Sequence, residues 1–310
     1  MKPTGLCPIR NARSFGWVFT FMLLTLVFTV QKSPAAGPFT IYVANYPLQY
    51  FAERIGGDQV KVVFPAPADV DPAYWHPNVA EISAYQKADL ILLNGAGYAK
   101  WVNKVSLPRS KMANTSRQFK DRYITTKAFM THSHGAQGEH AHESLAFTIW
   151  LDLQLAVQQA EAITRVLSLI QPEQKEAFKR NYESLKEDLL ALDQKILTIV
   201  SRAQSTPLLA SHPVYDYFVQ RYGLNLVSVH WEPDEVPGGD QWRELRRILT
   251  RHPAKWMIWE GAPVQATVGG LKTFGVNSLV FNPCGNVPEK GNFLSVMDRN
   301  AENLCAAFKK

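Results

Sequence analysis

Polar residues recur where β-rich segments end. Four such segments in the second half of the chain read PLLASH, NLVSVH, WMIWE and LVFN, and they end on His212, His230, Glu260 and Asn282. Parallel strands bring their carboxyl ends to one edge of a sheet, where open α/β sheets bind ligands. Imidazole, carboxylate and amide groups together suit a borderline divalent metal such as zinc or manganese.

A segment of the first half adds candidates to the same edge. PAPADVDPAYWHP follows a β-rich segment and carries Asp69, Asp71 and His76. If two sheets face each other, these side chains approach the four strand ends of the second half. We therefore include His76 among the candidate metal ligands.

Each candidate ligand also has a plain structural alternative. His212 and His76 each precede a proline, and either can cap a following helix. His230 can pack beside its neighbours, Glu260 can bond loop amides, and Asn282 before a proline is a common turn former.

A histidine-rich segment interrupts the first half. Residues 128–145, AFMTHSHGAQGEHAHESL, have no apolar periodicity and are typical of a surface loop. The loop carries His132, His134, His140 and His142, whose ring nitrogens can capture transition metals transiently. The alternative is a solvated linker in which the histidines occur by chance.

Short β-rich segments alternate with amphipathic ones, which predicts an α/β fold of parallel sheets flanked by helices. In the first half the strands are Phe39–Ala44, Val60–Phe64 and Leu90–Asn94, with helices near Tyr46–Ile55 and Pro77–Ala88. In the second half the strands are Pro207–Ser211, Asn225–His230, Trp256–Trp259 and Ser278–Phe281, and the helices are Val214–Tyr222, Asp240–Thr250 and Val264–Phe274.

One long helical stretch separates the halves. Residues 172–204 open with a proline and repeat apolar residues at helical spacing, and 33 residues would span about 50 Å. We expect this helix to join an N-terminal lobe (residues 36–171) to a C-terminal lobe (residues 205–310).

The charge balance excludes nucleic acid as a partner. The 310 residues carry a formal charge of +6, but residues 1–35 contain four basic residues and no acid. The remaining chain has 29 basic and 27 acidic residues. A nucleic-acid-binding protein is expected to have a larger excess of basic residues.

The N-terminus has the pattern of a secretory signal peptide. Basic residues precede the uncharged run of residues 15–30, and small residues follow, which predicts cleavage after Ala35. An uncleaved anchor is the alternative. Cleavage leaves Cys284 and Cys305, which either form a disulfide or remain free buried thiols.

Several motifs resemble those of the substrate-binding proteins of zinc/manganese-type ABC importers. The resemblance covers nearly all of residues 39–310 and includes a histidine-rich loop just ahead of the WLD motif. The motifs are DPAYWHPNVAEISAYQKADLILLNGAGYAKWVNK (71–104), TIWLDLQLA (148–156), SHPVYDYFVQRYGL (211–224) and FNPCG (281–285).

The resemblance implies two lobes joined by one long helix and a periplasmic protein that delivers a divalent metal, zinc or manganese, to an ABC permease in the inner membrane. We expect a monomer that binds metal and catalyses no reaction. The family's other metal ligands fall here on Ala73, Thr148 and Asn282, and only its third histidine, His212, is retained. The predicted metal ligands are His212, His76, Glu260, Asn282 and His230, with the loop histidines gathering ions.

Two other functions compete with metal delivery. The site can hold a chelated metal or a small organic solute between aromatic side chains such as Trp75, Trp150 and Trp231. A periplasmic metallohydrolase would use His212, His76 and Glu260 with an open fourth position, but the chain has neither HExxH nor GxSxG.

Overall fold

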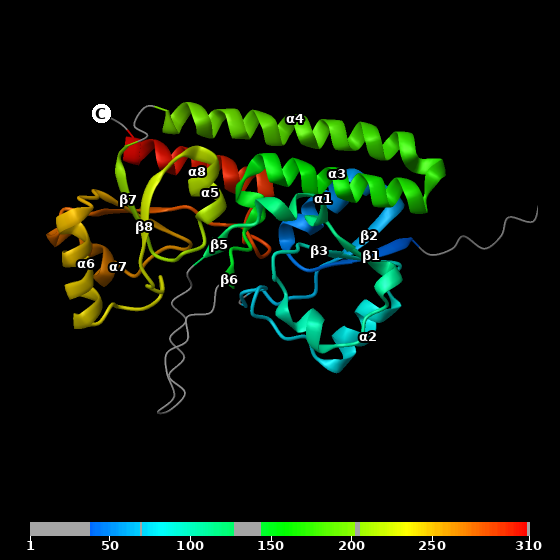
Figure 1. Cartoon of the computed structure of the whole chain (residues 1–310), viewed down its shortest axis with the longest axis horizontal. Helices are drawn as coiled ribbons and strands as arrows, with labels where there is room; N and C mark the ends of the chain where they lie inside the picture. Colours follow the sequence, from blue (N-terminus) through cyan, green and yellow to red (C-terminus); the bar gives the residue numbers. More distant parts are fainter. Residues whose placement is uncertain (1–37, 69, 127–143, 202–204, 309–310) are drawn as a thin grey trace, which may run out of the picture. The chain divides into compact units, whose positions relative to one another are not determined.

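Two four-stranded parallel sheets form the framework of the computed structural model, which describes residues 38–68, 70–126, 144–201 and 205–308 (Figure 1). The first sheet has the order β2–β1–β3–β4. Its strands are β1 (Phe39–Val43), β2 (Val60–Val63), β3 (Leu90–Leu93) and β4 (Met112–Asn114). The apolar run LILL of the inner strand β3 is largely buried, as expected for a parallel sheet covered on both faces.

The second sheet has the order β10–β9–β7–β8, and all its pairs are parallel. Its strands are β7 (Pro207–Ala210), β8 (Asn225–Ser228), β9 (Trp256–Trp259) and β10 (Asn277–Val280). A short antiparallel pair, β5 (Thr125–Thr126) and β6 (Ser144–Leu145), flanks the segment that contains the predicted histidine-rich loop. The predicted α/β fold with two parallel sheets is therefore confirmed.

Helices connect the strands close to the predicted positions. They are α1 (Tyr46–Gly56), α2 (Val79–Lys87), α3 (Leu153–Ile170), α4 (Lys175–Val200), α5 (Asp216–Tyr222), α6 (Gly239–Arg251), α7 (Gln265–Thr273) and α8 (Phe293–Phe308). Shorter 3₁₀ turns are η1 (Gly57–Gln59), η2 (Lys100–Lys104), η3 (Arg109–Lys111), η4 (Arg117–Arg122), η5 (Ile149–Leu151) and η6 (Pro172–Gln174). The helices α3 and α8 and the strands β4 and β5 were not predicted from the sequence, and β6 lies within the predicted loop. Among the described residues, no helix combines the length and the apolar character that a membrane span needs.

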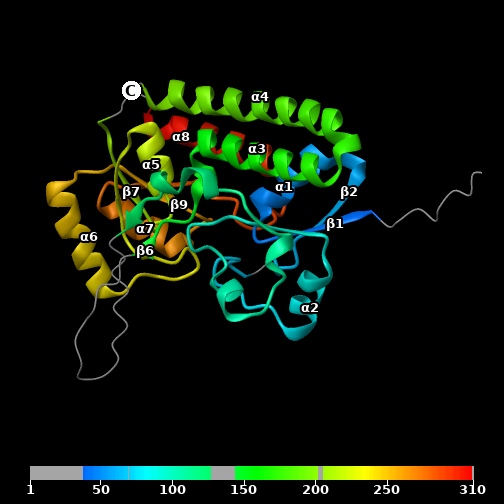
Figure 2. The ribbon, with the colours of Figure 1, turned by 45° about the vertical axis from the view of Figure 1, so that its right-hand side comes forward.

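Helix α4 is the predicted connector, although it is shorter than expected. Its 26 residues correspond to about 39 Å, because Pro172–Gln174 form a 3₁₀ turn and the described helix ends at Val200. It packs against α1 and α3 on the side of the first sheet and against α5 and α8 on the side of the second (Figure 2). It therefore contacts helices that lie beside each of the two sheets.

A buried carboxylate fixes α4 to its neighbours. Asp193 accepts hydrogen bonds from Arg221 (Nη2–Oδ2, 2.5 Å) and Tyr222 (2.8 Å) of α5, and from Gln154 (3.0 Å) of α3. Only 4% of the Asp193 side chain is exposed. A single acceptor thus joins an α-helix from each half of the chain to the connector.

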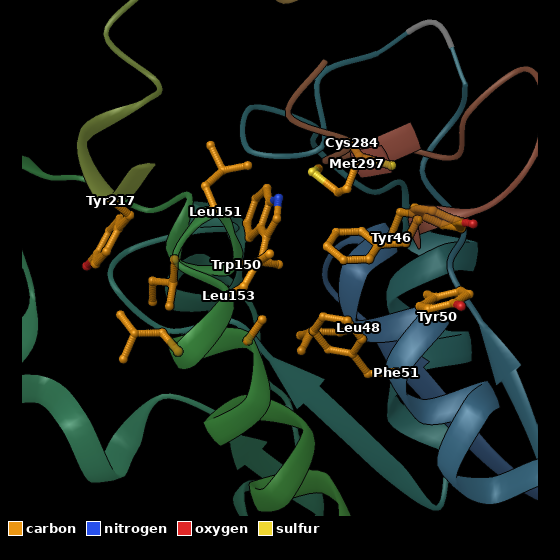
Figure 3. Packing of buried hydrophobic residues seen from close by; sticks show 14 of the residues in the cluster. Tyr46, Leu48, Tyr50, Phe51, Trp150, Leu151, Leu153, Tyr217, Cys284 and Met297 are labelled. Carbon is orange, nitrogen blue, oxygen red and sulfur yellow. The ribbon is translucent and has the colours of Figure 1, made fainter. Parts of the chain in front are cut away.

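The hydrophobic core is continuous between the two halves. Figure 3 shows Trp150 of η5 and Leu153, the first residue of α3, in the same cluster as Tyr46 of α1 and Cys284. The Trp150 indole donates to the carbonyl oxygen of Pro283 (2.7 Å). Cys284 and Cys305, the two cysteines of the described residues, are free thiols; Cys284 is buried and Cys305 is partly exposed. The predicted signal peptide and residues 128–143 of the predicted histidine-rich loop lie outside the described residues, whereas Ser144 and Leu145 form β6.

Candidate metal centre

His212 lies at the carboxyl end of β7, between two carboxylates. Its Nδ1 is 3.1 Å from Oε1 of Glu260, and its Nε2 is 3.2 Å from Oε1 of Glu232. The imidazole is 20% exposed, whereas Nδ1 itself is buried and, among the described residues, has no partner of hydrogen-bond geometry. Each ring nitrogen therefore has a carboxylate oxygen nearby, and the buried Nδ1 has unused hydrogen-bonding capacity.

Backbone hydrogen bonds beyond the strand ends bring these residues together. Ser211 N–H donates to Ile258 of β9 (2.8 Å), and Trp231 N–H donates to Ser211 (2.9 Å). These bonds extend the pairing of β7 with β9 and β8 past the regular sheet. Because Glu260 follows β9 directly and Glu232 follows Trp231, both carboxylates reach the residue that follows Ser211.

His230 completes the group from the segment that follows β8. Its ring centroid is 6.0 Å from that of His212, and the two ring planes meet at 81°. Burial, followed by the charge of His212, lowers the pKa of His230. His230 is therefore a neutral nitrogen donor at neutral pH, as a metal ligand must be.

The region accumulates negative charge. Burial raises the pKa of Glu260; His212 opposes this rise, and the nearby carboxylates Asp71 and Glu232 add to it. Burial of the carboxyl group also raises the pKa of Asp71, although the residue as a whole is exposed and its Oδ1 accepts from Ala73 N–H (2.9 Å). Three carboxyl groups close enough to influence one another favour a cation in their midst.

Two of the predicted ligands are placed differently. His76 is exposed and, within the described part of the chain, makes no hydrogen bond, ion pair or ring contact. The Oδ1 atom of Asn282 accepts from Cys284 N–H (2.7 Å), which is the turn-forming alternative considered for an asparagine before proline. Asp69 and the four loop histidines lie outside the described residues. The ligand roles of His76 and Asn282 remain predictions.

The residues at the positions of the family's first two histidines are buried and offer no nitrogen ligand. Ala73 and Thr148 are each 5% exposed, and the Thr148 hydroxyl donates to the carbonyl oxygen of Val214 (2.5 Å). Among residues 38–308 as far as they are described, no three His, Cys, Asp or Glu side chains are already grouped to hold one metal ion. The reason is visible at His212, because Glu232 and Glu260 face its two different nitrogens and so cannot share an ion through it.

The sequence reasoning missed Glu232. Its signal is the spacing His-Trp-Glu, because residues 230 and 232 point to one side of an extended segment while the buried Trp231 points to the other. The proximity of Glu232 to His212 could not be predicted from the sequence, because it depends on the pairing of β7 with β8.

Comparisons with known proteins agree with this fold. The Zn(II)-bound crystal structure of AdcA from Streptococcus pneumoniae superposes with a TM-score of 0.74 at 23% identity, covering 88% of this chain and 58% of that one. A crystal structure of YcdH from Bacillus subtilis superposes with a TM-score of 0.72 at 20% identity, covering 87% of this chain and 98% of that one. Both share the arrangement of two sheets described above.

Curated relatives are similar over most of this chain. The zinc-binding lipoprotein AdcA of Streptococcus pneumoniae serotype 4 is 27% identical over 91% of this chain and 58% of its own length. The high-affinity zinc uptake system protein ZnuA of Bacillus subtilis is 25% identical over 84% of each chain. The chain thus spans somewhat more than half the length of the first of these relatives. The model of the family described as "Zinc-uptake complex component A periplasmic" matches residues 41–307, and the chain therefore belongs to that family.

Proposed function

We propose that this protein is the solute-binding component of a metal ABC importer, and that it carries zinc at His212 to a permease in the inner membrane. Family membership supports the class of protein. The observation that carries the site is the His212 imidazole, partly exposed between two carboxylates at the carboxyl edge of the second sheet. It is also the one histidine of the family motif that this chain retains.

The chemistry required is binding without a reaction. Zinc prefers imidazole nitrogen and carboxylate oxygen among the side chains present here. The surplus of carboxylates draws the cation in and offsets part of its dehydration. Manganese is the second candidate cargo, since oxygen donors suit it well. No catalytic step is needed, and the protein acts as a carrier.

Export to the periplasm completes the proposal. The basic residues and the 16-residue uncharged run at the N-terminus favour a cleaved signal peptide ending at Ala35. The histidines at 132, 134, 140 and 142 would collect ions and pass them to the tighter site. Mass measurement of the periplasmic protein checks the cleavage, and an intact Met1 in the membrane fraction contradicts it.

Zinc titration of the mature chain tests the function. Zinc at 100 times its Kd stabilises a folded protein by about 2.7 kcal/mol, so the thermal midpoint should rise with zinc concentration. His212→Ala should abolish the tightest site while the metal-free variant melts like the wild type. His76→Ala, compared in parallel, measures whether that exposed histidine contributes. A wild type whose melting temperature zinc leaves unchanged contradicts the proposal, and native mass spectrometry would then look for an organic solute or metal chelate.

A further inference from the structure

The retained histidine lacks the partners that its family motif supplies. Ala73 and Thr148 offer no nitrogen, both are buried, and the Thr148 hydroxyl is engaged with Val214. A single imidazole does not hold zinc tightly, because structural and catalytic zinc sites use three or four protein ligands. The remaining ligands must therefore come from side chains that lie near His212 in this chain.

We infer that zinc binds to His212, His230 and Glu232, with Glu260 as the positioning residue of the His212 ring. This assignment rests on the proposed function and names the ligands of the same site. His230 and Glu232 both come from the segment after β8, and both lie near His212: Glu232 Oε1 is 3.2 Å from Nε2 of His212, and the ring centroids of His230 and His212 are 6.0 Å apart. The pair replaces the two imidazoles that the chain has lost.

The two nitrogens of His212 have different roles. Nδ1 is buried against Glu260, whereas Nε2 points to Glu232, whose side chain is 55% exposed. An ion arriving from solvent reaches Nε2 and not Nδ1. Metal-bound histidines commonly donate their other ring N–H to a carboxylate, which fixes the tautomer and the ring orientation. Glu260 is the carboxylate placed to receive that N–H.

The distances fit one zinc ion after a small adjustment. Two donor atoms on a tetrahedral zinc at about 2.0–2.1 Å lie about 3.3 Å apart. The distance between His212 Nε2 and Glu232 Oε1 is 3.2 Å. Two imidazoles on one such ion have centroids about 5 Å apart, against 6.0 Å for His212 and His230. An approach of the His230 ring by about 1 Å completes the three-ligand site.

Zinc affinities of single variants test the assignment by competition with a chelator that isolates the tightest site. Glu260→Gln should weaken zinc binding by about 10–100-fold, as expected for a residue that orients a ligand, and Glu260→Asp should recover part of the loss. His230→Ala and Glu232→Gln should each cost more than about 100-fold, because each removes a ligand itself. Glu235→Gln, three residues along the same loop and exposed, is the matched control and should bind zinc like the wild type.

Nitrogen-15 NMR of the zinc-loaded wild type gives a second readout that needs no substitution. The Nε2 atom of His212 and one ring nitrogen of His230 should show the shifts of metal-bound nitrogen, and His212 Nδ1 should remain protonated. In Glu260→Gln the His212 ring should lose this fixed tautomer, a change that loss of packing alone would not produce. A His230 ring that stays free of zinc in the loaded wild type overturns the assignment.

The outcomes separate this inference from the proposed function. If His212→Ala abolishes binding while His230→Ala and Glu232→Gln keep the wild-type affinity, the ligand assignment fails and the carrier function stands. If His212→Ala also binds like the wild type, zinc binds elsewhere and both fail.

Discussion

Removing the charge of Asp193 should loosen the connection of α4 to both halves of the chain. Burial alone would raise the pKa of Asp193, but hydrogen bonds from Arg221, Gln154 and Tyr222 outweigh burial and lower it. Asp193→Asn keeps the shape of the side chain and takes away the partner of the Arg221 guanidinium. In the variant, the side-chain NH₂ group of the asparagine takes the place of one carboxylate oxygen and faces hydrogen-bond donors. At least one of these hydrogen bonds is therefore lost.

The geometry sets the expected magnitude. Breaking a buried ion pair by removing one partner costs about 3–5 kcal/mol, and the Asp193 and Arg221 side chains are only 4% and 25% exposed. For a chain of this size 1 kcal/mol corresponds to about 2–4 °C in Tm. We therefore expect the Tm of Asp193→Asn to fall by about 10 °C.

Thermal unfolding of the metal-free mature chain, followed by circular dichroism at pH 7, measures the effect. The matched control is Asp188→Asn on the same helix, where the pair with Arg54 is 45% and 30% exposed. Such a surface pair contributes about 0–1 kcal/mol, so its Tm should hardly move. Equal melting temperatures for the two variants would refute the reasoning.

The pH dependence of the stability difference between wild type and Asp193→Asn tests the same reasoning independently. A carboxylate whose pKa is lowered by folding stabilises the protein above its unfolded pKa, near 3.8, and loses that contribution as the pH falls through the lowered folded value. The difference between wild type and Asp193→Asn should therefore be complete at neutral pH and shrink in acid below about pH 4. A difference that grows on acidification contradicts this account.

Three further predictions concern other parts of the chain. Burial raises the pKa of the Cys284 thiol to about 12, so a thiol reagent at pH 8 should label Cys305 quickly and Cys284 only on unfolding; equal labelling rates contradict this. Deleting residues 130–143 should leave the melting temperature unchanged and lower the number of weakly bound zinc ions, because the segment offers no apolar periodicity; a deletion that unfolds the protein shows that the loop is structural. Introducing the family ligands with Ala73→His, Thr148→His and Asn282→Asp should raise the zinc affinity measured by calorimetry by orders of magnitude. The triple variant should also have a lower Tm, because Ala73 and Thr148 are buried. Equal zinc affinities of the wild type and the triple variant would contradict the expected gain.

Local sequence patterns predict most strands and helices of the framework. Short apolar runs such as LILL (90–93) and WMIW (256–259) predict buried parallel strands, and they form inner strands of the two sheets. The apolar spacing of residues 178–200 predicts α4, because helical period and burial are both local properties. Helix α3 was not predicted, although the sequence carries a helix-start signal in Asp152, whose side chain caps α3 by accepting from Gln154 N–H and Leu155 N–H.

Part of the metal centre can be predicted from the sequence, and the rest depends on the tertiary structure. That His212, His230 and Glu260 share one edge follows from the sequence alone, because each stands at or just beyond the carboxyl end of a parallel strand. The sequence does not say which nitrogen of His212 meets which carboxylate, since Glu232 and Glu260 reach the ring from different neighbours of β7. Nor does it place His76, which is exposed two residues before Asn78, the N-cap of α2. Strand ends are local features of the chain, whereas the sides from which side chains meet depend on strand order and register, which only the folded chain decides.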